Sequence, residues 1–164
     1  MKAGKLYHRS AALVAAVALA LGSPPDVRAQ GRAQAPAVAA LRVLSTQGWN
    51  LRTPEGAAFQ RRFLAEGTGL ARQNGCLDDE RLPFDRLCQS YGTDDEMPDL
   101  MVGIKNEHIF AAILPGTSGQ ALGKDWRCKQ VLHDYYAVCF PTDTDIQTEM
   151  RWTDQITAFL GSLG

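Results

Sequence analysis

The sequence predicts a small mixed fold, α/β or α+β, with a sheet of about four strands, two main helices and stabilising disulfides. Apolar residues recur at helical spacing in residues 53–73 and again near the C-terminus. Several segments between these have the apolar runs and turn residues that are typical of strands. The chain also holds 4 cysteines, an even number that suits paired disulfides. This mixture of elements predicts helices packed on a sheet.

Residues 1–29 have the features of a secretory signal peptide. Three basic residues precede an uncharged apolar run, Ala11 to Leu21, and two prolines follow that run. The tripeptide Val27-Arg28-Ala29 suits a signal peptidase, so we expect cleavage after Ala29, with Ala33 as the alternative. The apolar run is shorter than the roughly 20 residues that span a bilayer. We therefore expect a periplasmic or secreted protein with no transmembrane anchor after processing.

The segment after the leader begins without a pattern and then turns into regular structure. Residues 30–40 are rich in Ala, Gln and Pro, which predicts a flexible leader to a single globular domain over residues 41–164. A first strand is expected from Leu41 to Ser45. A helix is expected over residues 53–73, because Thr53-Pro54 supplies a capping hydroxyl and a proline suited to the first helical position.

The middle of the chain predicts a loop followed by a hairpin. The stretch from Cys76 to Pro98 is acidic and loop-like, with a short helix at Phe84 to Ser90. Leu100 to Ile104 and His108 to Leu114 are expected to be strands. A turn at Asn106-Glu107 would join these two strands into a β-hairpin.

The last part of the chain predicts one more strand and a long helix. A turn cluster at Pro115 to Gly119 and a short helix precede the strand, which is expected over Val131 to Phe140. Thr144 or Asp145 can cap the C-terminal helix. The expected apolar face of this helix consists of Ile146, Met150, Ile156, Phe159, Leu160 and Leu163.

The cysteines all lie after the leader, where an exported chain would oxidise them. We favour the pairs Cys76–Cys88 and Cys128–Cys139, because each pair flanks a short stretch, while the other two connectivities remain open. Each bridge would close a loop of about a dozen residues and contribute roughly 3 kcal/mol. No pair has C-x-x-C spacing, so neither thiol redox chemistry nor a zinc knuckle is indicated.

Cleavage of the leader changes the charge of the chain. The leader carries four basic residues and one acidic residue, so 13 basic and 17 acidic residues remain, a net charge of −4. We expect no nucleic-acid partner, because nucleic acids bind to basic surfaces. The charge is uneven, since residues 30–77 hold six arginines and residues 78–99 hold eight acidic residues. Such asymmetry can steer a charged partner.

The acidic residues do not predict a metal site. Two acidic triplets begin at Asp78 and Asp94, and Asp143 and Asp145 follow later, but their spacing matches no EF-hand loop. The glycines from Gly116 to Gly123 do not fit the phosphate-binding Walker pattern. We therefore expect neither a metal nor a cofactor.

Two histidines, His108 and His133, follow the leader and offer an enzymatic alternative. A small extracytoplasmic hydrolase would need one of them in a cleft, with a carboxylate within hydrogen-bond reach. Asp134 does not meet this need for His133 on a strand, because adjacent strand residues point to opposite faces.

The absence of a catalytic motif favours a binding or accessory protein that acts through its surface. Trp49, Arg52 and Arg61 are the candidate binding residues. Trp49 follows the first predicted strand, and the crevice beyond such a strand is where α/β sheets usually bind ligands. The arginines suit a protein partner or a small anionic ligand. This site requires Trp49, with Arg52 or Arg61, to border a concave or flat exposed patch, and a buried Trp49 would contradict it.

Overall fold

The protein is described by a computed structural model that covers residues 36–65, 75–90 and 98–163. The chain separates into two units, Met1–Gly31 and Arg32–Gly164, and every described residue lies in the second unit. The predicted signal peptide lies outside the described residues, as does the first half of the predicted flexible leader.

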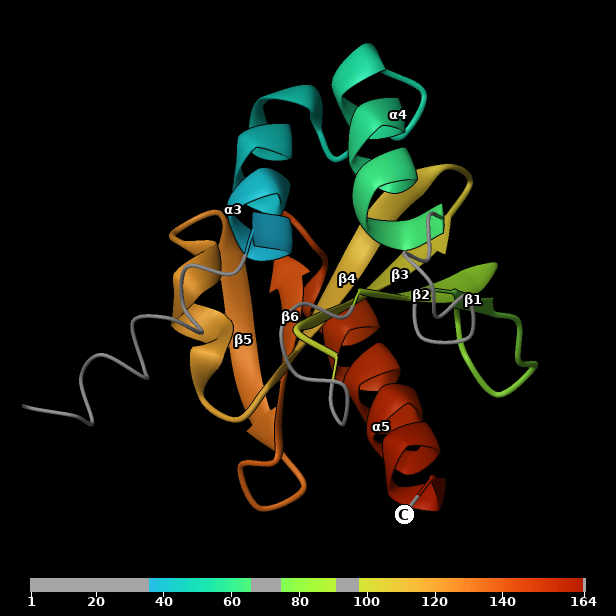
Figure 1. Cartoon of the computed structure of the whole chain (residues 1–164). Helices are drawn as coiled ribbons and strands as arrows, with labels where there is room; N and C mark the ends of the chain where they lie inside the picture. The colour runs from blue at the N-terminus through green and yellow to red at the C-terminus, as the bar shows by residue number, and fades with distance from the viewer. Residues whose placement is uncertain (1–35, 66–74, 91–97, 164) are drawn as a thin grey trace, which may run out of the picture. The chain divides into compact units, whose positions relative to one another are not determined.

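The described unit is built on a six-stranded antiparallel sheet with the order β1-β2-β3-β4-β6-β5 (Figure 1). The fold is therefore mixed α+β, and the prediction of about four strands was too low. The strands are β1 (Cys76–Leu77), β2 (Arg86–Ser90), β3 (Leu100–Lys105), β4 (His108–Pro115), β5 (Trp126–Val131) and β6 (Tyr136–Pro141).

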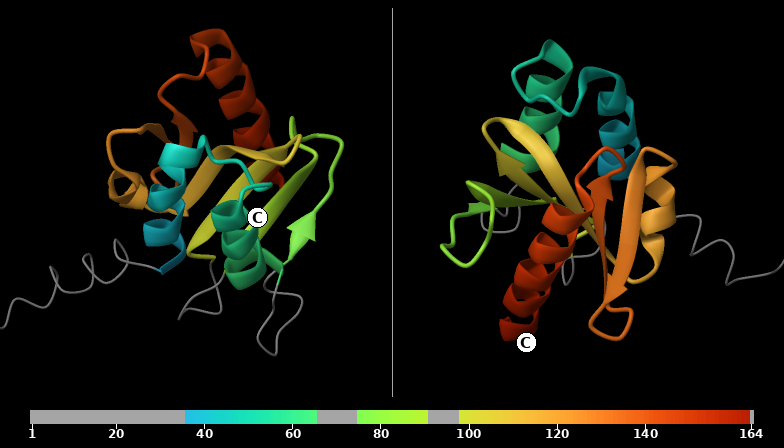
Figure 2. Two further views of the ribbon diagram at one scale, coloured as in Figure 1. Left: turned by 90° about the horizontal axis from the view of Figure 1, so that it is seen from above. Right: turned by 180° about the vertical axis from the view of Figure 1, so that it is seen from behind.

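Three helices cover the two faces of the sheet (Figure 2). Helix α3 (Pro36–Val43) continues as the 3-10 turn η1 (Leu44–Gln47), and α4 (Pro54–Phe59) continues as the π-helical turn η2 (Gln60–Ala65). Both pack on one face, while α5 (Ile146–Ser162) packs on the other. A short 3-10 helix, η3 (Ser118–Leu122), connects β4 to β5.

The core consists of two apolar clusters, one on each side of the sheet. The cluster under α3 and α4 includes Leu41, Leu44 and Phe59 together with Ile109 from β4. The cluster under α5 includes Ile156 and Phe159 together with other residues of the same strands. Neighbouring strand residues point to opposite sides of the sheet, so the strands contribute side chains to both clusters.

The first strand predicted from the sequence is wrong. Residues 41–45 belong to α3 and η1, and the buried residues Ala37, Val38, Leu41 and Leu44 recur at helical spacing. Helix α3 also begins inside the segment predicted as a flexible leader, because Ala37 and Val38 pack into the core. The short alternation at Leu41-Arg42-Val43 is part of this longer helical pattern.

The short helix predicted at Phe84 to Ser90 is also wrong. This segment contains strand β2, which pairs with β3 on one side and with β1 on the other. Strand β5 is not among the predicted elements. The strand predicted over residues 131–140 begins only at Tyr136, because a turn with positive φ angles lies between β5 and β6. Half of the predicted apolar face of α5 is exposed, namely Ile146, Met150 and Leu163, while Trp152 and Thr153 are buried instead.

Other predictions are confirmed. The hairpin of β3 and β4 turns at Asn106-Glu107. Helix α4 begins after the predicted cap Thr53, whose hydroxyl accepts a hydrogen bond from the Gly56 N–H at 3.1 Å. Residues 66–73 of the predicted first helix lie outside the described residues. Asp145 caps α5, and the cysteines pair as favoured, Cys76–Cys88 and Cys128–Cys139. In both disulfides the bonded cysteines face each other on neighbouring strands.

Candidate functional site

A cleft of about 310 Å³ opens at one end of the sheet, where β4 and β6 separate. The β4–β6 ladder extends from Pro115, opposite Tyr136, to Ala112, opposite Cys139. Continued in register, it would place Phe110 opposite Pro141, but both of these residues line the cleft. The cleft therefore lies between two strands that pair farther along the sheet.

A β-bulge in β4 lies at the point of separation. Gly103 of β3 faces Ala111 and the next residue, Ile104, faces Ile109, so Phe110 is the extra residue on β4. A bulge bends its strand and increases the local twist, which fits the divergence of β4 from β6. Phe110 and Ala111 consequently both pack towards α5, whereas Ile109 packs towards α3 and α4.

The loop between η1 and α4 takes the place of β6 beside the start of β4. Asn50 forms a β-bridge with His108, and the Ile109 N–H donates to the Trp49 carbonyl at 3.0 Å. The Leu51 N–H donates to the Glu107 carbonyl at 2.8 Å. These backbone contacts hold Trp49 in the wall of the cleft.

Trp49 combines two unfavourable features, a left-handed backbone and a buried indole N–H without an acceptor among the described residues. The φ of Trp49 is 54°, in the left-handed region, and the preceding Gly48 has a φ of 63°. The left-handed conformation costs a non-glycine residue roughly 1–2 kcal/mol. The Trp49 side chain is 9% exposed, and its indole Nε1 has no hydrogen-bond acceptor among the described residues. Leaving a buried donor unsatisfied costs about 1–3 kcal/mol. The ring packs edge-to-face on Trp126, with centroids 4.9 Å apart.

The opposite wall is aromatic and comes from α5. Trp152 is also 9% exposed and packs edge-to-face against Phe110, with ring centroids 5.9 Å apart. The ammonium of Lys105 lies 5.8 Å from the centroid of the Trp152 ring, which is cation–π distance. All 3 tryptophans of the chain thus line the cleft or contact a residue that does.

Two carboxylates lie at the cleft, in the connection from β6 to α5. The Asp145 carboxylate accepts from the backbone N–H and the hydroxyl of Thr148, at 3.1 and 3.0 Å. These bonds hold the pKa of Asp145 below its usual range. Asp143 is exposed and makes no hydrogen bond or ion pair with the part of the chain that the structure describes. A described cation lies beside this loop: the Arg127 guanidinium donates to the neighbouring Thr144 carbonyl at 3.3 Å and pairs with Glu149 rather than with Asp143.

His108 lines the cleft, but without the carboxylate partner that a hydrolase would need. Its Nδ1 lies 2.9 Å from the Asn106 carbonyl, and a carbonyl only accepts, so Nδ1 carries the proton and Nε2 the lone pair in the neutral ring. No carboxylate of the described residues is hydrogen-bonded to His108. His133 lies in the exposed turn between β5 and β6 and does not line the cleft.

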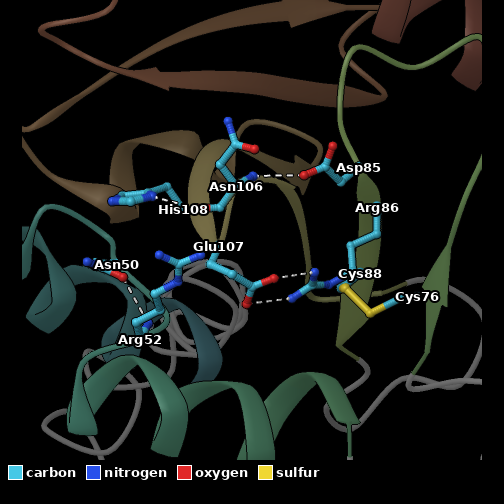
Figure 3. Close-up of polar contacts among 9 residues, drawn as sticks. All are labelled: Asn50, Arg52, Cys76, Asp85, Arg86, Cys88, Asn106, Glu107 and His108. Atoms are coloured by element: carbon cyan, nitrogen blue, oxygen red, sulfur yellow. Dashed lines mark hydrogen bonds and ion pairs between the residues drawn. A yellow bond between two sulfur atoms is a disulfide. The ribbon is translucent and has the colours of Figure 1, made fainter.

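A polar network fixes the hairpin turn beside the cleft (Figure 3). The Arg86 guanidinium donates to both carboxylate oxygens of Glu107, at 2.9 and 3.3 Å, and the Asn106 N–H donates to Asp85 at 2.8 Å. Arg86, together with the charges of Arg52 and His108, holds the pKa of Glu107 below its usual range. Asn106 and Glu107 both have positive φ, as a tight hairpin requires.

The predicted binding residues do not form one patch. Trp49 is buried, which contradicts the exposed patch predicted for it with Arg52 or Arg61, although Trp49 lines the cleft. Arg52 is exposed beside Glu107, and Arg61 is exposed on η2, so neither lines the cleft (Figure 3). Sequence reasoning missed Phe110 and Pro141, because a β-bulge and two diverging strands place these residues at the cleft.

The described residues contain no cluster of three or more potential metal ligands, so the site offers no metal centre within that part of the chain. In the same residues no helix combines the length and apolarity that a membrane span requires. Comparison with protein-family models, with curated proteins and with solved structures finds no match to the chain.

Proposed function

We propose that this protein is an exported binding protein that holds a small molecule in the cleft between β4 and β6. The observation that carries the proposal is Trp49. Its left-handed backbone and its buried, unsatisfied indole N–H both lower stability, and Trp49 lines the cleft. Trp126, which packs on Trp49, has a second buried indole N–H without an acceptor among the described residues. Local strain that is retained in this way clusters at binding and catalytic sites.

The composition of the cleft supports binding of a small ligand. Aromatic and apolar walls with a few polar groups are typical of ligand pockets, and a volume of about 310 Å³ is at the small end of their range. The two disulfides fit a secreted or extracytoplasmic protein. Export through the predicted signal peptide belongs to the same proposal.

Intrinsic tryptophan fluorescence tests the proposal directly, because two of the three tryptophans line the cleft and the third, Trp126, contacts Trp49. We expect some members of a library of small fragments to shift or quench the emission on titration. Asp143→Arg would place a long side chain at the mouth of the cleft and should abolish this response. Asp154→Arg is the matched control, since Asp154 is exposed on α5 and does not line the cleft. A response that survives Asp143→Arg, or no response to any fragment, would contradict the proposal.

The export part has its own test. Expression with the intact leader in a bacterial host, followed by fractionation and N-terminal sequencing, should give an extracytoplasmic protein that begins at Gln30. Cytoplasmic protein that retains residues 1–29 would overturn this part and leave the cleft proposal standing.

The second candidate is a hydrolase that uses His108. It is favoured by one observation: the Asn106 carbonyl fixes Nδ1 as the donor of His108, a residue that lines the cleft, which leaves Nε2 as the atom that can accept a proton. Hydrolysis of a small activated ester should then be abolished by His108→Gln and unaffected by His133→Gln. Activity that persists in His108→Gln would exclude this candidate.

A further inference from the structure

We infer that the ligand of the cleft carries an ammonium group on a small apolar body. This inference rests on the proposed function and adds the chemical class of the ligand. It depends on the charges around the cleft and on its aromatic walls, which are separate observations.

The charges at the cleft favour a cation. Its described lining includes Asp143 and Asp145 but no lysine or arginine, and the nearby Arg127, which donates to the Thr144 carbonyl, is paired with Glu149. The capping bonds from Thr148 compensate Asp145, whereas Asp143 has no partner among the described residues. A ligand ammonium beside Asp143 would form a charge-assisted contact, which is stronger than a neutral one. An anion would meet two carboxylates, which argues against the anionic ligand expected from Arg52 and Arg61.

The aromatic walls favour a cation as well. Trp49, Phe110 and Trp152 line the cleft, and a ring whose face reaches the cleft would attract a cation within about 6 Å. The ring of Trp152 already has one cation beside it, the Lys105 ammonium at 5.8 Å from its centroid. Lys105 is therefore expected to compete with, or repel, a ligand cation at this wall.

Three probes of similar shape and different charge test the inference: 2-phenylethylamine, 2-phenylethanol and 3-phenylpropionate. Titrations followed by tryptophan fluorescence and calorimetry should give an affinity for the amine about tenfold above that for the alcohol. The carboxylate should bind most weakly. Added salt should weaken binding of the amine and leave binding of the alcohol nearly unchanged.

Charge substitutions sharpen the test, because two of them should act in opposite directions. Asp143→Asn should lower the affinity for the amine about tenfold and leave that for the alcohol unchanged. Lys105→Met should raise the affinity for the amine by about two- to fivefold, since it removes a positive charge beside Trp152. Asp154→Asn is the matched control and should change neither affinity, because Asp154 is exposed and does not line the cleft.

The possible results separate the inference from the proposed function. Equal binding of amine and alcohol, or a preference for the carboxylate, overturns the ammonium inference. An amine affinity that is insensitive to Asp143→Asn overturns it as well. In each case the proposed function stands if other fragments still bind in a way that Asp143→Arg abolishes. If no fragment in the library binds, the proposed function itself falls.

Discussion

The substitution Gly56→Ala should destabilise the protein, although it places alanine inside a helix. A Cβ on Gly56 would lie 2.1 Å from the Asn50 carbonyl oxygen and 2.7 Å from the Leu51 Cα. These neighbours are backbone atoms, which a rotamer change cannot move aside. Helix α4 therefore approaches the loop that holds Trp49 so closely that only glycine fits.

The expected magnitude follows from two opposing effects. Replacing glycine by alanine inside a helix stabilises by up to about 1 kcal/mol. Overpacking costs about 1–3 kcal/mol, and contacts to backbone favour the upper end. We therefore expect Gly56→Ala to lower the free energy of unfolding by about 2 kcal/mol.

Gly161 of α5 provides the matched control. A Cβ there would meet only Leu132 Cδ2, at an ordinary 3.7 Å. Gly161→Ala should therefore stabilise the protein by about 0.5 kcal/mol, reduced from the mid-helix value because the helix ends nearby.

Urea denaturation monitored by circular dichroism measures the change in free energy of unfolding for both variants. A shift of the denaturation midpoint reports stability if the dependence of that free energy on urea concentration is the same as in the wild type. Gly56→Ala should also change the tryptophan emission of the folded protein, because the displaced loop carries Trp49. If both variants are stabilised to a similar extent, the close approach of α4 to the loop is refuted.

Two further predictions concern the ion pair and a disulfide. Arg86→Met should lower the free energy of unfolding by about 0.5 kcal/mol at neutral pH, the scale of a partly exposed pair. The pKa of Glu107 is lower in the folded protein than in the unfolded chain. The ion pair therefore contributes its full stability at pH values above the pKa of Glu107 in the unfolded chain. This contribution is lost as the pH falls through the pKa of Glu107 in the folded protein. The difference between wild type and variant should thus shrink in acid, and a constant difference would contradict the assignment. Cys128→Ala/Cys139→Ala should lower the free energy of unfolding by about 3 kcal/mol, measured by urea denaturation without reductant. An unchanged midpoint would show that the disulfide does not stabilise the fold.

The sequence predicts the elements whose signals are local. The β3–β4 hairpin has apolar strands on both sides of a polar turn, and α5 has a capping residue followed by apolar residues at helical spacing. The disulfide pairing was also predictable, because each pair of cysteines is close in sequence.

The remaining elements depend on contacts between distant segments. Strand β2 lacks a clear alternation and forms because β3 pairs along its whole length. Helix α3 has helical spacing, but only when Ala37 and Val38 are counted as apolar core residues. Alanine-rich composition suits both a flexible segment and a helix, so composition alone does not separate them.

The site was predicted only in part for the same reason. Trp49 was selected from its position in a loop, and the structure places it in the cleft. Two distant segments form the rest of that cleft: the start of β4, and the stretch from the end of β6 through the first turns of α5. Their meeting depends on the bulge at Phe110, which is a property of the register between β3 and β4.

The placement of the two disulfides has a consequence for how the sheet can open. Each one ties an outermost strand to its inner neighbour, β1 to β2 on one side and β5 to β6 on the other. Edge strands are where sheets fray and where they recruit strands from other molecules. Here neither edge strand can slide by one position or detach fully, because its partner is covalently bound. Amide hydrogen exchange in the oxidised protein should therefore be protected at both margins, and opening should begin at the seam between β4 and β6, beside the cleft.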